Sequence, residues 1–296
     1  MRRVKTLAVI GVGLIGGSFA LALRRAGIAT RVVGFDRDLA ALESAASLGV
    51  IDAAADSISE AVHGADLVVI AVPVRSVGPV LHDVALSMDD GAVVTDVGST
   101  KVEVARVARE ELRERFSRFV PGHPIAGRET SGVESALADL FRGARVVLTP
   151  VRETAADALD TVRNAWEAVG GRVAVADAAE HDRIFAAVSH LPHILSFALV
   201  SEIASRENAA ELLGFAAGGF RDFTRIAASS PQMWRDIAMQ NREALLAEID
   251  SYGARLAVFR DLIERGEASG LERLMTEARS ARTAWAAGAK RPPTGE

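Results

Sequence analysis

Short apolar runs alternate with helical patterns along the first part of the chain. The runs that we predict as buried strands span 6–10, 31–35, 66–72, 92–96, 117–121, 145–149 and 172–175. The helices that we predict between them cover 16–25, 39–48, 77–87, 101–115 and 155–169. Nearly continuous apolar strands that alternate with helices are typical of a parallel sheet covered on both faces. The pattern therefore predicts an α/β domain with a mostly parallel sheet over residues 1–177.

The strand pattern stops near residue 177, and only helical periodicity follows. The predicted helices span 181–205, 209–213, 233–264 and 269–286. Apolar residues recur at three- and four-residue spacing from Leu245 to Ile263, which is the stripe of an amphipathic helix. Because so long a stripe exposes more apolar surface than one small domain can cover, it predicts an all-α dimerisation domain over 178–289. Residues 290–296 are predicted to form a flexible tail.

A glycine-rich motif lies between the first predicted strand and the first predicted helix. Gly11, Gly13 and Gly16 fit the pattern G-x-G-x-x-G, with Leu14 and Ile15 as the intervening pair. The three glycines would allow a tight turn, a close approach of the backbone to a pyrophosphate, and close helix–strand packing. The start of the helix would offer free N–H groups to the anion. This context favours a Rossmann-type dinucleotide-binding domain over a glycine turn that merely packs a helix.

Asp36 ends the second predicted strand, twenty residues after Gly16. A carboxylate at this position can accept hydrogen bonds from both ribose hydroxyls and would repel a 2′-phosphate, which favours NAD over NADP. The neighbouring Arg37 could offset part of that repulsion. FAD uses the same glycine pattern, but no later flavin signature is evident. We therefore expect NAD as the cofactor.

Composition and charge narrow the class of protein. The chain has 296 residues, of which 49% are hydrophobic and 25% charged, so a mainly disordered chain is excluded. The net charge of −5 speaks against nucleic acid as a partner. Without cysteine, disulfides, a thiol nucleophile and a cysteine-built zinc site are all excluded. The apolar run before Gly11 is too short for a signal peptide or a membrane span. We expect a cytoplasmic enzyme or binding protein with no membrane partner.

His123 is the best candidate for a catalytic group. It lies in a predicted loop just past a strand, and open parallel sheets bind ligands beyond the carboxyl ends of their strands. An imidazole held there could take the proton from a hydroxyl whose carbon gives hydride to NAD. Alternatively, His123 only caps a backbone carbonyl. Ser99 follows another strand end and could cap the next helix, bind substrate or orient His123.

Polar residues of the helical part form two further groups. His190 and His193 lie near one helix face, but no carboxylates at ligand spacing accompany them, so we expect no metal site. Arg221 and Arg225 follow a glycine pair and could bind a substrate with two carboxylates, because arginine binds carboxylate in a fork geometry. The alternative is a surface pair with one salt bridge to Asp222.

Several motifs in this order are specific. They are Gly-Val-Gly-Leu-Ile-Gly-Gly-Ser at 11–18, Asp-Val-Gly-Ser-Thr-Lys at 96–101, Gly-His-Pro-Ile-Ala-Gly at 122–127, Ser-His-Leu-Pro-His at 189–193, Asp-Phe-Thr-Arg at 222–225 and Met-Trp-Arg-Asp at 233–236. With them the chain resembles the prephenate/arogenate dehydrogenase family of tyrosine biosynthesis over about residues 4–265. The resemblance implies NAD-dependent oxidative decarboxylation of prephenate to 4-hydroxyphenylpyruvate and CO2, driven by aromatisation of the ring.

The resemblance also implies roles for individual residues. His123 matches the catalytic histidine that hydrogen-bonds the ring hydroxyl, and Ser99 the serine that supports it. Arg225 matches the arginine that binds the substrate carboxylate. The further substrate-binding positions that it implies are His193, Glu129 and Arg221, the last of them in its own site or in the partner's. The family implies a homodimer formed through the helical domain. We expect no regulatory ACT domain after Ala286, because the chain leaves no room for one.

Three alternatives concern the substrate, the class of enzyme, and whether the protein is an enzyme. The sequence does not separate prephenate from arogenate, which differ only in a keto acid or amino acid side chain. A β-hydroxyacid dehydrogenase would need a catalytic lysine early in its helical domain, and 177–289 contains no lysine. A non-catalytic, dimeric NAD-binding regulator would not need His123 or Arg225.

Overall fold

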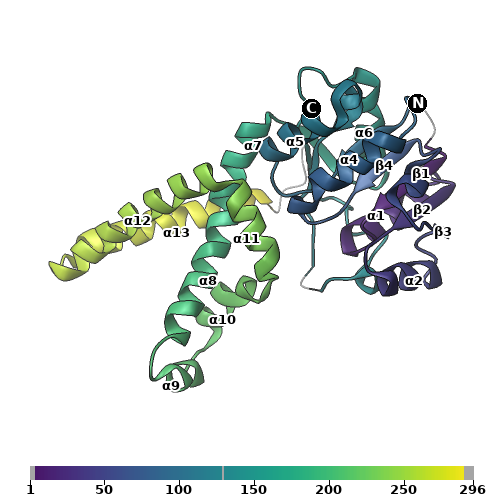
Figure 1. Cartoon of the computed structure of the whole chain (residues 1–296). Coiled ribbons are helices and arrows are strands. Elements are labelled where there is room, and N and C mark those ends of the chain that lie inside the picture. Colours follow the sequence, from purple (N-terminus) through teal and green to yellow (C-terminus); the bar gives the residue numbers. More distant parts are fainter. Residues whose placement is uncertain (1–3, 129, 290–296) are drawn as a thin grey trace. The chain divides into compact units, whose positions relative to one another are not determined.

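The computed structural model describes residues 4–128 and 130–289, and its first part is built on a parallel sheet (Figure 1). The six strands lie in the order β3-β2-β1-β4-β5-β6 and all pair in parallel. Their bounds are β1 Thr6–Ile10, β2 Arg31–Phe35, β3 Ala53–Ala54, β4 Leu67–Ile70, β5 Val93–Asp96 and β6 Phe119–Val120. This is the sheet order of a dinucleotide-binding fold, with the order reversing between β1 and β4. The predicted fold class is confirmed.

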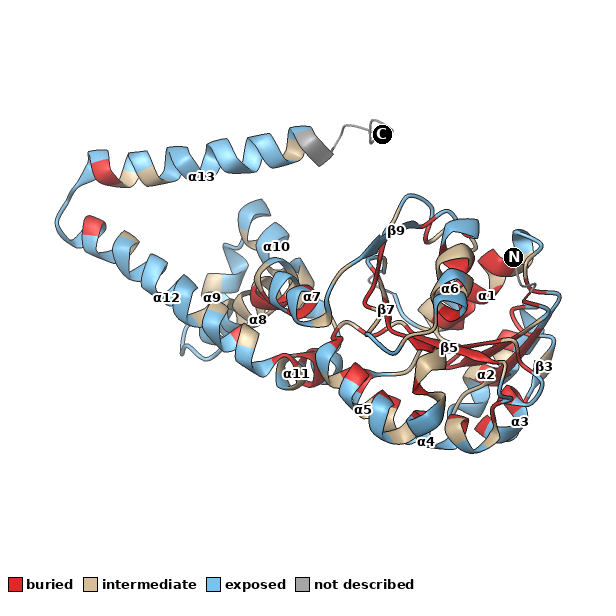
Figure 2. Ribbon diagram, turned by 90° about the horizontal axis from the view of Figure 1, so that it is seen from above, coloured by how far each residue is buried: buried red, intermediate tan, exposed pale blue. Residues whose placement is uncertain are grey.

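Helices cover both faces of this sheet. They are α1 Leu14–Arg25, α2 Leu39–Ser47, α3 Ile58–Val62, α4 Val77–Ser87, α5 Val102–Leu112 and α6 Ala156–Ala168. Phe19 of α1 and Trp166 of α6 pack with Val9 on one face. Leu81 of α4 packs with Ala8 on the other. Adjacent residues of β1 thus serve opposite cores, which is why the strands are apolar throughout. Figure 2 shows the buried residues gathered along these strands.

A second, three-stranded sheet follows the first. Its strands are β7 Gly122–Pro124, β8 Arg145–Leu148 and β9 Arg172–Val175, and β8 pairs antiparallel with β7 and parallel with β9. The sequence predicts β8 and β9 but treats residues 121–127 as a loop. That expectation is wrong for His123, because its backbone lies in β7 opposite Val147. Pairing on a strand gives the imidazole a more rigid base than a loop would.

Helices make up the rest of the described chain. They are α7 Ala178–Phe185, α8 Leu191–Ala204, α9 Ala209–Gly214, α10 Gly218–Thr224, α11 Pro231–Gln240, α12 Arg242–Glu264 and α13 Ala268–Ala289. A π-helical turn, η4 (Ala186–His190), joins α7 to α8, and such turns are frequent at functional sites. The single helix predicted over 233–264 is interrupted at Asn241. The cause is tertiary, because the Asn241 side chain bonds to two other residues.

One continuous helical stretch, Ala178–Ala204, has the length and apolarity that a membrane span requires. Its most apolar window has a mean hydropathy of 1.6, and 22% of that window is buried. Core and interface helices of globular proteins can have the same composition. The expected absence of a membrane partner therefore stays a prediction.

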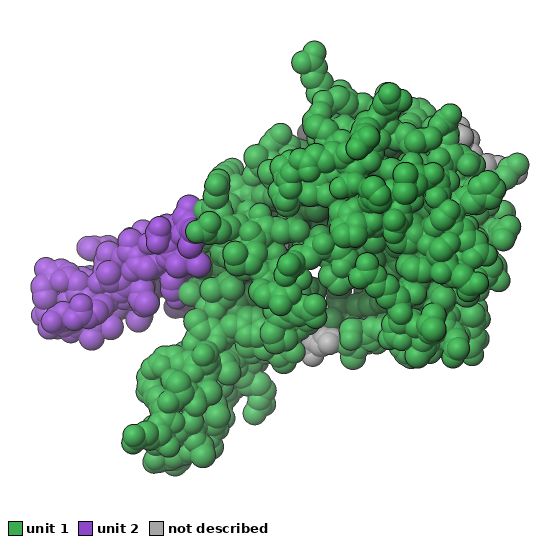
Figure 3. Space-filling model, viewed as in Figure 1, with its two compact units in different colours: residues 1–245 green, residues 246–296 purple. Residues whose placement is uncertain are grey.

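The chain divides into two compact units, residues 1–245 and 246–296 (Figure 3). The described part of the second unit consists of most of α12 and of α13. Large apolar side chains in it are exposed, among them Leu256 at 57%, Ile263 at 63% and Trp285 at 66%. The predicted domain division at residue 177 stays a prediction. The tail predicted over 290–296 lies outside the described residues.

Candidate active site

The glycine loop has the geometry of a phosphate cradle. Gly11 has φ of +96°, and a Cβ added to it would lie 2.5 Å from the carbonyl oxygen of Ala71. A Cβ on Gly16 would lie 2.1 Å from the carbonyl oxygen of Gly11, so both positions need glycine. Gly13 precedes α1, and a Cβ there would meet nothing within 4 Å. No side chain caps this helix start, so its N–H groups suit a pyrophosphate in the open space before Gly13.

Asp36 is held beside the loop at the end of β2. Its Oδ2 accepts a hydrogen bond of 3.0 Å from the backbone N–H of Val12, and its Oδ1 accepts one of 3.0 Å from Asp38. Leu14 and Ile15 form the first turn of α1, and Ile15 packs against the core. The carboxylate is thus fixed next to the loop, and its expected contact with the ribose of NAD stays a prediction.

Alanine at Gly13 and at Gly16 should separate cofactor binding from folding. Gly13→Ala should leave stability unchanged within about 0.5 kcal/mol, because its Cβ meets open space. It should lower dinucleotide affinity about 10- to 100-fold, since the Cβ occupies space needed by the pyrophosphate. Gly16→Ala should cost about 1–3 kcal/mol of stability, because the backbone of Gly11 must move. Calorimetric titration and chemical unfolding of both variants test this, and equal unfolding curves would contradict it.

Replacing Asp36 should change cofactor preference. The wild type should favour NAD over NADP by more than about tenfold, the equivalent of roughly 1.4 kcal/mol for one charged contact. Asp36→Ser removes the negative charge and should narrow that ratio, while the exposed control Asp38→Ser should leave it unchanged. Initial rates with each cofactor measure the ratio. Equal use of both cofactors by the wild type would show that Asp36 does not set the preference.

A buried ion pair positions the backbone next to His123. Asp96, at the end of β5, receives the Lys101 ammonium at 2.5 Å, and both side chains are fully buried. Lys101 Nζ also donates to the Gly122 carbonyl at 2.7 Å, and Asp96 Oδ1 accepts the Gly122 N–H at 3.1 Å. Both backbone groups of Gly122 are therefore held. Burial lowers the pKa of Lys101, and the charge of Asp96 opposes that effect.

His123 belongs to a short chain of hydrogen-bonded side chains. Its Nδ1 lies 2.9 Å from Nε2 of His181, and Nδ1 of His181 lies 2.8 Å from Asp182 Oδ1. Phe185 packs against both imidazole rings. Burial, and then the charge of Lys101, hold the pKa of His123 well below its usual range. The ring is thus neutral at neutral pH and able to accept a proton.

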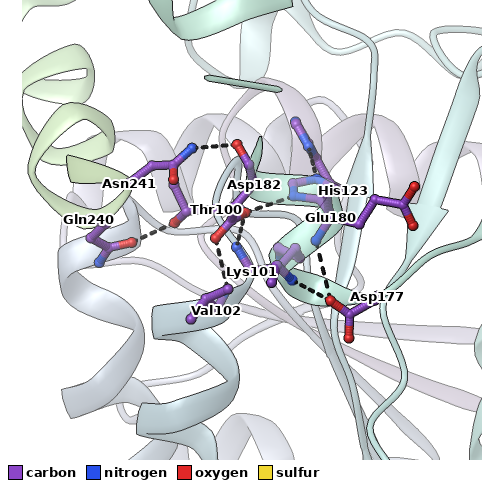
Figure 4. Close-up of polar contacts among 12 residues, drawn as sticks. Thr100, Lys101, Val102, His123, Asp177, Glu180, Asp182, Gln240 and Asn241 are labelled. Atoms are coloured by element: carbon purple, nitrogen blue, oxygen red, sulfur yellow. Dashed lines mark hydrogen bonds and ion pairs between the residues drawn. The ribbon is translucent and has the colours of Figure 1, made fainter. Parts of the chain in front are cut away.

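Asp182 ties α7 to the start of α5 (Figure 4). Its two oxygens accept the backbone N–H groups of Lys101 at 2.8 Å and Val102 at 2.9 Å. Ser99 therefore does not cap α5, and that alternative is wrong, because the helix begins at Val102 after Lys101. Ser99 lies half-buried in the turn between β5 and α5. Its expected role beside His123 stays a prediction.

A second histidine group surrounds Trp234 of α11. His193 stacks on the indole with ring centroids 3.5 Å apart, and its Nδ1–H donates to the Ser189 carbonyl at 2.9 Å. His190 approaches the same indole edge-on and lies 3.1 Å from the Asn241 side-chain nitrogen. Burial lowers the pKa of His190 to about 4. In residues 4–128 and 130–289, no group of three or more His, Asp or Glu is arranged to hold a metal ion.

Arg221 and Arg225 lie four residues apart, in α10 and at the start of η5 (Arg225–Ala228), and both are exposed. Burial lowers the pKa of His193, and the positive charge of Arg225 lowers it further, against the effect of the Ser189 hydrogen bond. The common substrate pocket expected for Arg225 and His193 stays a prediction. Glu129, predicted to bind substrate, lies outside the described residues.

Four buried residues of this site have no role among the expectations from sequence: Asp96, Lys101, His181 and Asp182. Asp96 and Lys101 stand in the quoted 96–101 motif, at a strand end where ligands bind, and that position was a usable signal. The adjacent His181-Asp182 pair at a helix start was another. Asn241, whose side chain donates to the Asp182 carbonyl at 2.7 Å, carried no such signal.

The fold and site define a dinucleotide-binding enzyme of the dehydrogenase class. Its features are the glycine loop before α1 and a half-buried histidine, His123, on β7. The family model described as the prephenate dehydrogenase nucleotide-binding domain matches residues 19–175, and that of its dimerization domain matches 177–277. The chain belongs to the prephenate dehydrogenase family. The expected dinucleotide cofactor agrees with the nucleotide-binding domain.

Individual relatives carry different substrate names. A cyclohexadienyl dehydrogenase of Zymomonas mobilis is 36% identical over 95% of this chain and 96% of its own length. The crystal structure of prephenate dehydrogenase from A. aeolicus with hydroxyphenyl propionate and NAD+ has a TM-score of 0.90 and 36% identity, covering 96% of this chain and 99% of its own. Arogenate dehydrogenase of Synechocystis has a TM-score of 0.80 and 30% identity, covering 95% and 99%.

Proposed function

We propose that this chain uses NAD to convert prephenate to 4-hydroxyphenylpyruvate and CO2 in tyrosine biosynthesis. The observation that carries the proposal is the placement of His123 on β7, hydrogen-bonded to His181 and next to Gly122, which the ion pair of Asp96 and Lys101 holds. The glycine loop and Asp36 would hold NAD, which would supply the hydride acceptor for the ring carbon that bears the hydroxyl. The NAD complex of the A. aeolicus relative supports the choice of cofactor, and Asp36 supports NAD over NADP.

His123 accepts the proton of the substrate hydroxyl in this proposal. A neutral imidazole can do so, and its lowered pKa keeps it neutral at neutral pH. Ser99 would hold the hydroxyl or the ring from the β5–α5 turn. Arg225 would fix the ring carboxylate that leaves as CO2, and so contributes orientation rather than a proton. His193, Glu129 and Arg221 would complete the substrate pocket.

Arg225→Ala should act on substrate binding. A charged hydrogen bond contributes about 1.5–3 kcal/mol, so KM for substrate should rise about 10- to 100-fold. The kcat should change far less, because the variant keeps His123. Arg206→Ala, at an exposed arginine that follows α8 and pairs with Glu202, is the control and should leave both constants unchanged. A large fall in kcat with an unchanged KM would show that Arg225 acts in the chemical step.

We further propose a homodimer formed by a helical domain over 178–289, beside a dinucleotide domain over 1–177. Of the fourteen residues of α8, only Leu191 and Ser196 are buried, although the helix is strongly apolar. The apolar side chains of α8 require a cover, and in the second unit so do the exposed apolar residues of α12 and α13. The dimerization-domain match supports a second copy of the chain as that cover. Light scattering at micromolar concentration tests the dimer, and a monomer would contradict it.

Arogenate is the second candidate substrate. The Zymomonas relative is named for cyclohexadienyl substrates in general, and the Synechocystis neighbour for arogenate. Initial rates of NADH formation with prephenate and with arogenate, compared in parallel at the same concentrations, decide between them. We expect a higher kcat/KM with prephenate. A higher value with arogenate would reverse the assignment.

A further inference from the structure

The structure shows a polar chain that ends on His123 and has no assigned role. It runs from the Asp182 carboxylate through His181 to His123, with steps of 2.8 and 2.9 Å. His181 is 1% exposed and Asp182 4%. Both come from α7, whereas His123 comes from β7, so three side chains are brought together by tertiary structure. Burying polar groups costs folding free energy unless their hydrogen bonds are satisfied, so a buried network of this kind calls for an explanation.

The direction of each hydrogen bond follows from the Asp182 end. An ionised carboxylate can only accept, and Asp182 already accepts the backbone N–H groups of Lys101 and Val102. Nδ1 of His181 must therefore carry its proton and donate it to Asp182. In neutral His181 the other nitrogen, Nε2, then holds a lone pair.

The hydrogen bond to His181 determines which nitrogen of His123 carries the proton. Since Nε2 of His181 accepts, the Nδ1 of His123 at 2.9 Å must donate. The proton of neutral His123 thus resides on Nδ1, and its Nε2 holds the free lone pair. A His123 with its proton on Nε2 would place two lone pairs against each other, and it could not accept a proton from substrate through that nitrogen.

We propose that His181 and Asp182 are positioning residues that set the tautomer of His123, so that Nε2 is the proton acceptor of the reaction. Phe185, packed against both rings, keeps them in place. The backbone N–H groups at the start of α5 donate to the Asp182 carboxylate. These hydrogen bonds link the row of side chains to the turn that carries Lys101 and Ser99. The proposal rests on the proposed function, in which His123 is the base.

Two substitutions of His181 test the hydrogen bond. His181→Leu removes the acceptor, whereas His181→Gln places an amide oxygen about where Nε2 lies and can still accept from His123. His181→Leu should lower kcat about 10²-fold, the lower end of what a positioned base contributes, with KM nearly unchanged. His181→Gln should retain most of the kcat. His82→Leu, which removes an exposed histidine paired with Glu111, is the control and should behave as wild type.

Nitrogen-15 NMR of histidine-labelled protein shows which nitrogen of His123 carries the proton, and it does so without an activity measurement. The His123 signals are those that His123→Asn removes, and in the wild type they should show Nδ1 protonated and Nε2 bare. In His181→Leu the proton should move to Nε2. A wild-type His123 with its proton on Nε2, or His181→Leu with normal kcat, overturns the inference. A normal kcat in His123→Asn would instead overturn the proposed function, so the two failures are distinguishable. Should His181→Leu not fold, the wild-type tautomer and His181→Gln still decide.

Discussion

Substituting asparagine for His123 is expected to lower kcat by about 10²–10⁴-fold, the contribution of a positioned general base. Asparagine keeps a side-chain hydrogen-bonding group of similar reach but cannot accept a proton at neutral pH. The backbone of β7 stays paired with Val147, so the fold should be retained. Affinity for NAD should change little, because the glycine loop and Asp36 hold the cofactor.

The same base determines the expected pH profile. Because the pKa of His123 is lowered well below the usual histidine value of about 6.5, the imidazole stays unprotonated as pH falls through that value. The value of kcat/KM should fall when His123 gains a proton. This decrease on the acid side should therefore lie below about pH 6.5, and it should be absent in His123→Asn. An acid limb above neutrality, or a variant with near-normal turnover, would make His123 a structural residue. Loss of NAD binding as severe as the loss of activity would contradict the role equally.

Replacing Lys101 with methionine is expected to cost about 3–5 kcal/mol of folding free energy, the cost of breaking a buried ion pair. The variant leaves the Asp96 carboxylate buried without its cation and the Gly122 carbonyl without its Nζ donor. Methionine matches the length of the lysine stem, so packing changes little. Removing the positive charge should also raise the pKa of His123, since that charge is one cause of its depression.

Urea unfolding at one protein concentration measures the Lys101 effect. Lys5→Met is the control, because Lys5 is exposed and directly precedes β1. Its free energy of unfolding should stay within about 0.5 kcal/mol of the wild-type value. Adding Asp96→Asn to Lys101→Met should recover part of the loss, because no unpaired charge is then buried. A Lys101→Met protein as stable as the control would mean that the pair does not hold β5 and β7 together.

The parallel sheet could be predicted because its strands are buried on both faces. In the run at 66–72 every residue after Asp66 is apolar, so no polar position suggests a helix face, and the run contains β4. The short β7 could not be predicted, because its three residues, Gly122, His123 and Pro124, carry no alternation. Its pairing depends on β8, more than twenty residues away. The break at Asn241 also depends on distant groups, namely Asp182 and His190.

The candidate site divides in the same way. The glycines and Asp36 could be predicted because the residues that form the cradle are close in sequence and their spacing is specific. His123 was found through its motif, but its partner His181 lies 58 residues further along the chain. No local pattern links them, since β7 and α7 meet only in the folded protein. The buried Lys101 is similar, because its burial cannot be inferred from a motif at a helix start.

We propose that this chain oxidises and decarboxylates prephenate with His123 as the base. The most direct test incubates purified protein with NAD and prephenate and follows NADH and released CO2 together, with His123→Asn in parallel. We expect equal amounts of NADH and CO2 from the wild type and about 10²–10⁴-fold slower formation from the variant. Binding of NAD without formation of either product, with prephenate or with arogenate, would contradict it and indicate a non-catalytic NAD-binding protein.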